Sequence, residues 1–500
     1  MASTPALIAS APVPVATPVR AGRLPRSAAL YLLASIVLFF LAASSAPTPL
    51  YAVYQADWGF SPITTTIVFG VYALAVLATL LTVGSLSDHI GRRPVLLTAL
   101  AVQVVAMVVF ATAGGVPALL MARVLQGLST GAAIGAVGAG MLDLSKVRGT
   151  TANAVAPVLG TAVGALASGL LVQYLPIPTH LVYLVLLVVF LAQAIGVTMM
   201  GETAAPKPGA LASLRVGFAL PPAIRGPFLI AAPVLVAVWA LAGFYGSLGP
   251  SLVRVVTASN SLVLGGLALF VLAGSGAVTV LLLRSAVPRT MMIFGTLALL
   301  VGVGVTLLGV NHNSTAALFL GTAVAGVGFG ASFQGAIRTV IPLAETHERS
   351  GVLSLLYVVS YLAMGLPAVL AGFLVVHAGG VLQTAREYGG AVMALAALAL
   401  LGTLLSGAQG RVRASEVLPG SQPPAARCSV AIVSFPRRGT CPRTNGVRIA
   451  DLHDRGLGVR AVAVELSRSP STIGWELRRR RDPDSGHYRP FTAHRATVGR

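Results

Sequence analysis

The sequence predicts an all-α membrane protein in which twelve transmembrane helices form two pseudo-symmetric six-helix bundles, followed by a small basic helical tail. Of its 500 residues, 56% are hydrophobic and only 10% are charged, and the mean hydropathy is +0.86. A soluble chain of this size carries charges on about a quarter of its residues. Lipid must therefore surround most of this chain, which excludes an ordinary soluble protein.

Twelve apolar runs are long enough to cross a bilayer, which takes about 20 residues of helix. Six precede a proline-containing stretch near residues 202–226 and six follow it. We expect the spans at residues 28–52, 61–85, 94–114, 117–142, 152–174, 179–201, 227–250, 262–284, 290–310, 315–342, 351–377 and 389–407. The spacing therefore predicts two halves of six spans each.

The composition of the segments around the spans suggests the domain boundaries. Half of the net charge of +20 lies in the last 90 residues, so the tail differs chemically from the rest of the chain. We expect a disordered cytoplasmic N-terminus at 1–27, an N-terminal bundle at 28–201, a cytoplasmic linker at 202–226, a C-terminal bundle at 227–407, a second linker at 408–446 and the basic tail at 447–500.

Lysine and arginine gather in alternate connectors, and this bias sets the orientation of a membrane protein. One side has only Arg254 and Arg386. The other side has Arg20, Arg23, Arg26, Arg92, Arg93, Lys146, Arg148, Lys207, Arg215, Arg225, Arg284, Arg289 and Arg349. We therefore expect a multi-pass protein of the cell (inner or plasma) membrane with both termini in the cytoplasm. The first arginines also fit a secretory signal, but the spans that follow at once favour an uncleaved first helix.

A short charged loop separates the second and third spans and reads Gly84-Ser85-Leu86-Ser87-Asp88-His89-Ile90-Gly91-Arg92-Arg93-Pro94. Gly84 lets a neighbouring helix approach its backbone, and Gly91 permits a tight turn. Asp88 can face a helix N-terminus, and it can pair with Arg92, four residues on, if that stretch is helical. The alternative is a basic connector that only follows the orientation rule.

The spacing of glycines, acid and bases resembles the loop between spans two and three of the major facilitator superfamily, written G-x-L-a-D-r-x-G-r-r-p. The resemblance implies a transporter fold of two six-span halves, in agreement with an echo between residues 141–149 and 342–350. In the second half, residues 284–289 occupy the place of the loop but lack its aspartate and glycines. The resemblance also implies a conformational-switch loop made of Gly84, Asp88, Gly91, Arg92 and Arg93.

One arginine lies inside the expected fourth span, in the stretch Arg123-Val124-Leu125-Gln126-Gly127-Leu128-Ser129-Thr130-Gly131. An arginine at the centre of a span costs about 2.5–3.5 kcal/mol, so it marks a functional candidate by default. The family resemblance implies that Arg123 couples protons to substrate movement, with Gln126 beside it. No acid lies in the middle of a span, so Asp57, in the first outer connector, is the acidic coupling candidate. The alternative is that Arg123 extends to lipid headgroups near the outer surface.

In the family that the loop resembles, spans one, four, seven and ten line the central cavity. Carried onto this sequence, the resemblance implies cavity positions at Phe39, Phe40, Tyr51, Arg123, Gln126, Trp239, Phe244, Tyr245, Phe333, Gln334 and Arg338. Aromatic walls with few polar groups fit amphipathic molecules better than sugars, whose hydroxyls need replacement partners. The alternative is that these aromatic side chains only fill gaps between helices. The proline of the family's antiporter signature is replaced by Ala165 and Leu166, which leaves the direction of transport open.

The end of the chain has a different pattern, Ser469-Pro470-Ser471-Thr472-Ile473-Gly474-Trp475-Glu476-Leu477-Arg478-Arg479-Arg480-Arg481. A serine-capped helix with a basic end fits a DNA-recognition helix. The run resembles the N-terminal helix-turn-helix of insertion-sequence transposases. That resemblance implies base contacts and phosphate contacts from Ser469, Ser471, Thr472, Arg478 and Arg479. Gly474 and Trp475 depart from the pattern, and the alternative is a passive, solvated basic tail.

We expect a secondary active transporter that works by alternating access and exports small amphipathic compounds. Its expected partners are a small-molecule substrate, the lipid bilayer and protons as a candidate coupling ion, and a monomer is expected. Two alternatives stay open: an importer or facilitator of sugars or other metabolites, and a membrane-tethered protein that binds nucleic acid through the tail. The sequence has no phosphate-binding loop, and Cys428 and Cys441 lack metal-site spacing. We therefore expect no enzyme activity, no metal and no cofactor.

Overall fold

The computed structural model describes residues 22–214, 220–345, 348–416 and 458–465, and every regular element in these ranges is a helix. The chain divides into two compact units, residues 1–418 and 419–500. All the long helices of the described residues belong to the first unit. The described part of the second unit consists of α17, Val459–Glu465, and the residue before it.

The first half of the larger unit begins at the first arginine-flanked apolar run. Its helices are α1 Arg26–Ser45, α2 Pro47–Trp58, α3 Pro62–Val83, α4 Ser87–Ile90, α5 Arg92–Ala111, α6 Val116–Leu144, α7 Lys146–Tyr174 and α8 Pro178–Met199. Prolines at the first helical turn start α3, α6 and α8, where the missing N–H of proline costs no hydrogen bond.

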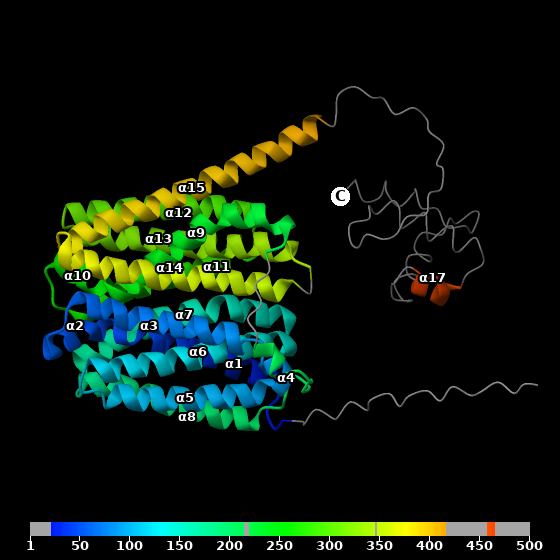
Figure 1. The fold of residues 1–500 in the computed structure, drawn as a ribbon, viewed down its shortest axis with the longest axis horizontal. Coiled ribbons are helices and arrows are strands. Elements are labelled where there is room, and N and C mark those ends of the chain that lie inside the picture. Colours follow the sequence, from blue (N-terminus) through cyan, green and yellow to red (C-terminus); the bar gives the residue numbers. More distant parts are fainter. Residues whose placement is uncertain (1–21, 215–219, 346–347, 417–457, 466–500) are drawn as a thin grey trace, which may run out of the picture. The chain divides into compact units, whose positions relative to one another are not determined.

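The second half repeats this order after a short 3-10 turn, η1 Ala212–Leu214. Its elements are α9 Pro222–Ser247, α10 Gly249–Thr257, α11 Leu262–Leu282, α12 Pro288–Asn311, α13 Thr315–Val340, η2 Ile341–Leu343, α14 Arg349–His377 and α15 Gly380–Glu416. The long helices of both halves lie side by side, coloured blue to teal in the first half and green to yellow-orange in the second (Figure 1).

Within the described residues, twelve helical segments are long and apolar enough to cross a membrane, which confirms the predicted number. The last helix differs from its predicted bounds. α15 begins at Gly380 instead of 389 and extends to Glu416, past the expected end at 407. Arg386 therefore lies within a helix and not in a connector.

Each half has an apolar core of its own. Phe40, Leu96 and Phe190 are fully buried in the first core, and the second is built from all the long helices of the second half, most of all from α9. A third, smaller cluster joins the halves, because Tyr72 and its neighbours on α3 pack against Tyr361 and its neighbours on α14. The two cores with one seam between them match the predicted pair of pseudo-symmetric bundles.

The first span is broken between α1 and α2, at Ala46. Pro47 follows the break directly, and Pro49 lies two residues further on. A proline has no N–H and disrupts the hydrogen bond to the carbonyl four residues earlier. The carbonyl of Ala43 therefore loses its helical partner, and in lipid such a group needs another donor.

The seventh span is broken in the same way, at Leu248 between α9 and α10. Pro250 removes the helical donor for the carbonyl of Gly246, and Thr48 Oγ1 of the first half donates to that carbonyl over 2.9 Å. Pro49 and Pro250 are 201 residues apart, the same shift that separates Arg148 from Arg349. The repeat of the two halves thus includes their breaks.

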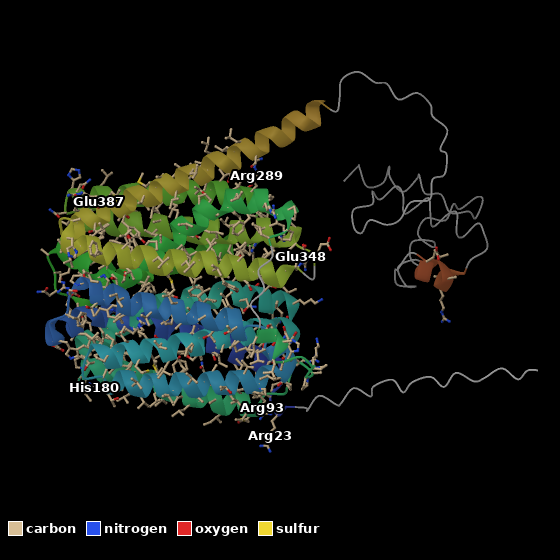
Figure 2. All side chains as sticks on the ribbon, viewed as in Figure 1. Arg23, Arg93, His180, Arg289, Glu348 and Glu387 are labelled. Atoms are coloured by element: carbon tan, nitrogen blue, oxygen red, sulfur yellow. The ribbon has the colours of Figure 1, made fainter. Side chains whose placement is uncertain are left out.

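We call the end of the bundle that carries residues 84–93 the loop end, and the opposite end the far end. Arg93, Arg289 and Glu348 mark the loop end, and His180 and Glu387 mark the far end (Figure 2). At the far end, Gln173 Oε1 accepts hydrogen bonds from Ser261 Oγ at 2.8 Å and from the backbone N–H of Val263 at 3.1 Å. The last turn of α7 therefore caps the N-terminus of α11 across the seam between the halves.

Replacing Thr48 with valine should destabilise the protein, because the buried carbonyl of Gly246 is left without a donor. The expected loss is about 1–3 kcal/mol in the free energy of unfolding, measured by chemical unfolding in detergent micelles. Thr48→Ser should keep wild-type stability. Thr82→Val is the matched control, since within the described residues the exposed Thr82 hydroxyl donates only to the carbonyl of Ala78 in its own helix. Equal stability of Thr48→Val and wild type would contradict the assignment.

Candidate functional site

The charged loop is a short helix followed by a turn that only glycine adopts easily. α4 ends at Ile90, and Gly91 has φ +100°, a region that strains other residues. A Cβ on Gly91 would also lie 2.6 Å from Glu202 Oε2. The backbone of Gly84 lies close to α6, since a Cβ on Gly135 of α6 would be only 2.8 Å from the carbonyl oxygen of Gly84.

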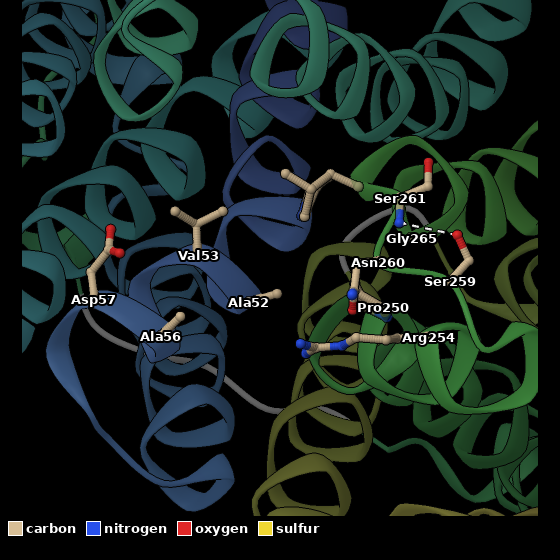
Figure 3. Close-up of a pocket in the computed structure, with 12 residues that line it drawn as sticks. Ala52, Val53, Ala56, Asp57, Pro250, Arg254, Ser259, Asn260, Ser261 and Gly265 are labelled. Atoms are coloured by element: carbon tan, nitrogen blue, oxygen red, sulfur yellow. Dashed lines mark hydrogen bonds between the residues drawn. The ribbon is translucent and has the colours of Figure 1, made fainter.

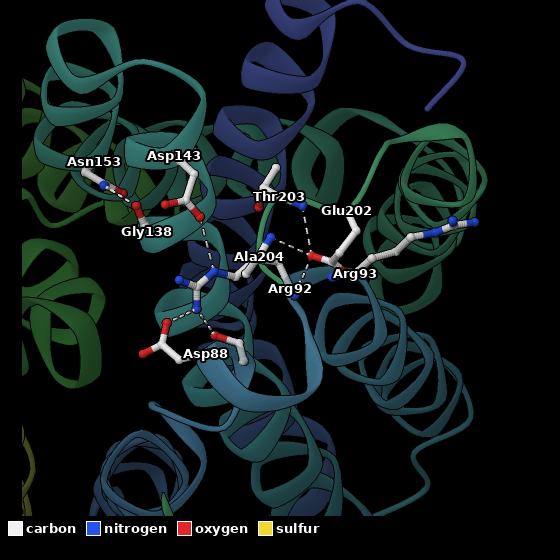
Figure 4. Close-up of polar contacts among 10 residues, drawn as sticks. Asp88, Arg92, Arg93, Gly138, Asp143, Asn153, Glu202, Thr203 and Ala204 are labelled. Carbon is white, nitrogen blue, oxygen red and sulfur yellow. Dashed lines mark hydrogen bonds and ion pairs between the residues drawn. The ribbon is translucent and has the colours of Figure 1, made fainter. Parts of the chain in front are cut away.

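Arg92 is the centre of the loop and is 7% exposed. Its Nη1 forms an ion pair with Asp88 and donates to Ser87 Oγ at 2.7 Å. Its Nε lies 3.4 Å from Asp143 Oδ2 at the end of α6. Figure 4 shows this guanidinium between the two carboxylates. Arg92 thus connects the charged loop to the C-terminal end of α6, and the carboxylates of Asp88 and Asp143 both compensate its charge.

The first turn of α5 is capped by Glu202. Glu202 Oε1 accepts from the N–H of Arg92 at 2.8 Å, and Oε2 accepts from the N–H of Arg93 at 3.1 Å (Figure 4). A carboxylate is favourable there because these N–H groups are unpaired and carry the positive end of the helix dipole. The sequence suggested Asp88 for this position. The structure gives that position to Glu202, because Asp88 precedes the turn at Gly91 and its carboxylate faces Arg92.

The segment after Glu202 lies across the loop. The Lys207 N–H donates to the carbonyl of His89 at 2.8 Å, and His89 Nδ1 lies 3.0 Å from the carbonyl of Pro208. Ser85 Oγ donates to the carbonyl of Ser213 at 2.9 Å. The connection between the halves is therefore attached to the loop, so that a shift of the loop also moves this connection.

Arg123 is fully buried, at 0% exposure. Its Nη1 donates to the carbonyl of Ser44 at 2.9 Å and to Gln126 Oε1 at 2.6 Å, and its Nε donates to the Tyr51 hydroxyl at 3.1 Å. Gln126 Nε2 in turn donates to the carbonyl of Ala43 at 2.9 Å. The alternative of an arginine extended to lipid headgroups is therefore contradicted by its position.

The break in the first span explains how this charge is accommodated. Ala43 and Ser44 carry carbonyls at the C-terminal end of α1, the negative end of the helix dipole. The guanidinium also lies over three aromatic rings, at 5.6 Å from Tyr51, 5.2 Å from Tyr72 and 5.8 Å from Phe110. Within the described residues Arg123 forms no ion pair with a carboxylate, so carbonyl dipoles and ring faces provide its compensation.

A cluster of aromatic rings lies on the second half of the seam. Trp239 of α9 is 5.3 Å from Phe333 of α13 and 5.9 Å from Tyr361 of α14, measured between ring centroids. Trp239 also packs against the cluster that contains Tyr72, one of the three rings around Arg123. Its buried Nε1 has no hydrogen-bond partner among the described residues. This arrangement offers apolar surface with one free donor.

The remaining cavity candidates make other contacts. Phe40 is fully buried against Phe190. Phe244 packs against Tyr388, and the Tyr245 hydroxyl is 2.7 Å from that of Thr322. The other two lie on α13: Gln334 is half-buried beside Phe333, and Arg338 Nη1 donates to the carbonyl of Arg284 at the loop end. Phe244 and Tyr245 thus belong to the core of the second half, against which Trp239 and Phe333 also pack, whereas Phe40 belongs to the core of the first half and Arg338 lies at the loop end.

Asp57 lies within α2 and not in a connector as expected, and at the far end it lines a cavity of about 320 Å³ between α2 and α10. Arg254 lines the same cavity from the second half (Figure 3). Asp57 forms no ion pair with Arg123 in the described part of the chain. The two coupling candidates are thus separate groups in this conformation. No cluster of three metal-ligating side chains occurs among the described residues.

Sequence reasoning missed three contributors to these sites. Asp143 and Glu202 directly follow the expected fourth and sixth spans in the sequence, but nothing in their spacing shows that they reach the loop. Pro47 was visible within an apolar run, and the rule that proline frees a carbonyl four residues earlier would have indicated donors nearby. The DNA-contact candidates Ser469, Ser471, Thr472, Arg478 and Arg479 lie outside the described residues.

The fold and the two sites define a multi-pass helical membrane protein whose halves are joined at a seam and at a charged loop. Residues 32–286, which are 255 of the 500 residues, match the family model of the Major Facilitator Superfamily. The chain belongs to this superfamily and is a transporter of that family. Residues 447–480 match a helix-turn-helix domain.

A crystal structure of the nucleoside transporter NupG, in an aspartate-to-alanine mutant form, has the same fold. The TM-score is 0.60 at 12% sequence identity, and the match covers 76% of this chain and 100% of that one. At this identity the likeness concerns the fold alone. No curated protein sequence matches the chain.

The Glu202 cap leads to a prediction about the first turn of α5. Glu202→Gln removes the charge and one of the two acceptors, which should cost about 1 kcal/mol locally. Amide hydrogen exchange of Arg92 and Arg93 should then accelerate about fivefold, measured by mass spectrometry on the full chain. Glu387→Gln is the control, because Glu387 is exposed at the far end and bonded only to Gln383 within the described residues. Unchanged exchange at Arg92 and Arg93 would show that Glu202 does not stabilise this turn.

Proposed function

We propose that this transporter is secondary active, works by alternating access and exports small amphipathic compounds. Two neighbouring groups of residues at the seam carry the proposal. One is the Arg123 guanidinium with its aromatic rings, and the other is the cluster of rings around Trp239 in the second half. Together they offer apolar ring faces, one free indole N–H and a cation. Such a surface suits a molecule with a flat apolar body and an electron-rich polar group.

Two further features support alternating access. Spans one and seven are both broken, so each can bend without unfolding a continuous helix. The hydrogen bonds that Thr48 and Gln173 make across the seam hold the halves together beyond the breaks, toward the far end. If the halves rock about the seam, these bonds form when the far end closes and separate when it opens.

Protons are our candidate coupling ion, with Asp57 as the acidic group of the first span. Asp57 is exposed in the far-end cavity, where it can exchange protons with water. We further propose a monomer in the cell membrane with the loop end facing the cytoplasm. Support for this orientation is the concentration of lysine and arginine in the loop-end connectors.

Export is tested by accumulation of fluorescent amphipathic dyes in a pump-deficient host. Expression should lower dye accumulation, and a protonophore should restore it. Arg123→Lys should reduce export at least tenfold at equal expression, because lysine keeps the charge but lacks the fork that reaches Tyr51, Ser44 and Gln126 together. Arg386→Lys, at the exposed far end, should export normally.

The same cells also test the alternative function, import. Radiolabelled sugars, nucleosides and other metabolites are offered to the same cells, and nucleosides are included because the structurally similar NupG is a nucleoside transporter. Higher uptake of any of them, with no change in dye accumulation, would contradict export and establish an importer or facilitator. A protonophore without effect would exclude protons as the driving ion.

Deleting the tail distinguishes a transporter from the alternative of a membrane-tethered DNA-binding protein. Deleting residues 417–500 leaves α15 intact and removes the residues that match the helix-turn-helix domain. We expect substrate flux per molecule to stay at the wild-type level. The reading as a DNA-binding protein gains support only if the full chain, purified in detergent, shifts duplex DNA in a salt-dependent manner and the truncated chain does not.

A further inference from the structure

The two halves treat the charges at the loop end differently. In the first half, carboxylates of Asp88 and Asp143 contact Arg92, and Glu202 caps the next helix. In the second half, the corresponding residues 284–289, which form the connector between α11 and α12 and the start of α12, contain Arg284 and Arg289 and no acid. The repeat has therefore kept the basic charge of the connector and lost its internal counter-charge.

Three arginines lie at or next to this connector, and we call them the arginine trio: Arg284, Arg289 and Arg338. Arg338 Nη1 donates to the backbone carbonyl of Arg284 at 2.8 Å, which brings the end of α13 to the connector. Arg289 Nη2 donates to the carbonyl of Thr403 on α15 at 3.3 Å. Within the described residues, none of the trio forms an ion pair with a carboxylate. Each guanidinium still has donors for which the described part of the chain provides no acceptor.

The surface beside the trio is apolar and outward-facing. Leu282 precedes Arg284 and is 74% exposed, and Val287, between the two connector arginines, is 64% exposed. Phe294 on α12 and Leu405 on α15 are about half exposed. In a membrane protein such side chains contact lipid chains. The arginines thus lie where the lipid-facing surface ends, at the level of phospholipid headgroups.

We propose that the arginine trio binds the phosphate of an acidic phospholipid, whose acyl chains cover the exposed apolar side chains of α11, α12 and α15. The phosphate replaces the carboxylates that the first half provides from its own sequence. Arginine forks match phosphate oxygens in geometry, and basic pockets between transmembrane helices bind anionic headgroups. A soluble phosphate would meet the same forks, but it would leave the apolar surface without a partner. The proposal does not depend on the substrate or direction of transport.

The test uses the full chain in nanodiscs of phosphatidylcholine, with or without phosphatidylglycerol. Phosphatidylglycerol should raise the thermal unfolding temperature, and native mass spectrometry should show its retention over phosphatidylcholine. Replacing the trio by glutamine (Arg284→Gln, Arg289→Gln, Arg338→Gln) should lower that preference by about fivefold per arginine. The corresponding triple lysine variant keeps the charges and should keep most of the preference for phosphatidylglycerol. This result would show that the loss in the glutamine variant comes from the lost charge and not from misfolding.

Matched controls separate this site from general basic charge. Lys146→Gln with Arg148→Gln changes two exposed loop-end charges of the first half and should leave the lipid preference unchanged. An equal loss in this control and in the glutamine trio would overturn the assignment to the connector. Retained preference in the glutamine trio would overturn the proposal itself. If inorganic phosphate in pure phosphatidylcholine nanodiscs reproduces the temperature rise, the ligand is a soluble phosphate and not a lipid.

Discussion

The structure depends on one constraint: a backbone carbonyl inside a bilayer must find a donor, because lipid offers none. The two broken spans show how this chain meets it. Pro47 and Pro250 each remove a helical partner, and the freed carbonyls accept instead from Gln126 and Thr48. One of these bonds stays within a half and the other crosses the seam. The breaks are therefore places where the backbone of one helix depends on side chains of another.

The same constraint accounts for an arginine at the centre of a membrane protein. A buried cation normally needs an acid, and removing one partner of such a pair is costly. Here the cation faces the carbonyl end of α1 and three aromatic rings. Carbonyl dipoles and ring faces do not take up protons, so the groups that compensate this cation are not themselves titrated when the pH changes. The titratable acid of the first span, Asp57, lies apart in the far-end cavity.

Much of the fold followed from the sequence, because apolar length and the alternation of basic connectors are properties of contiguous residues. The twelve spans, the two halves and the loop glycines belong to this class. Glu202 and Asp143 could not be placed, because their contacts join residues 110 and 51 positions apart in the chain. Of the aromatic residues predicted to line one cavity, only some lie together at the seam. The residue type alone does not reveal which side of a helix faces the seam. Arg338 shows this most clearly, as it lies at the loop end beside Arg284.

The bond between Thr48 and Gly246 has a consequence for the role of water. Its donor and acceptor belong to opposite halves, so parting them leaves two polar groups that neither half can satisfy alone. Both then have to be hydrated, and the same holds for Gln173 and the first turn of α11. Opening at that end is thus a wetting event as much as a movement of helices. Its equilibrium shifts with water activity, and osmolytes excluded from a narrow cleft favour the closed arrangement.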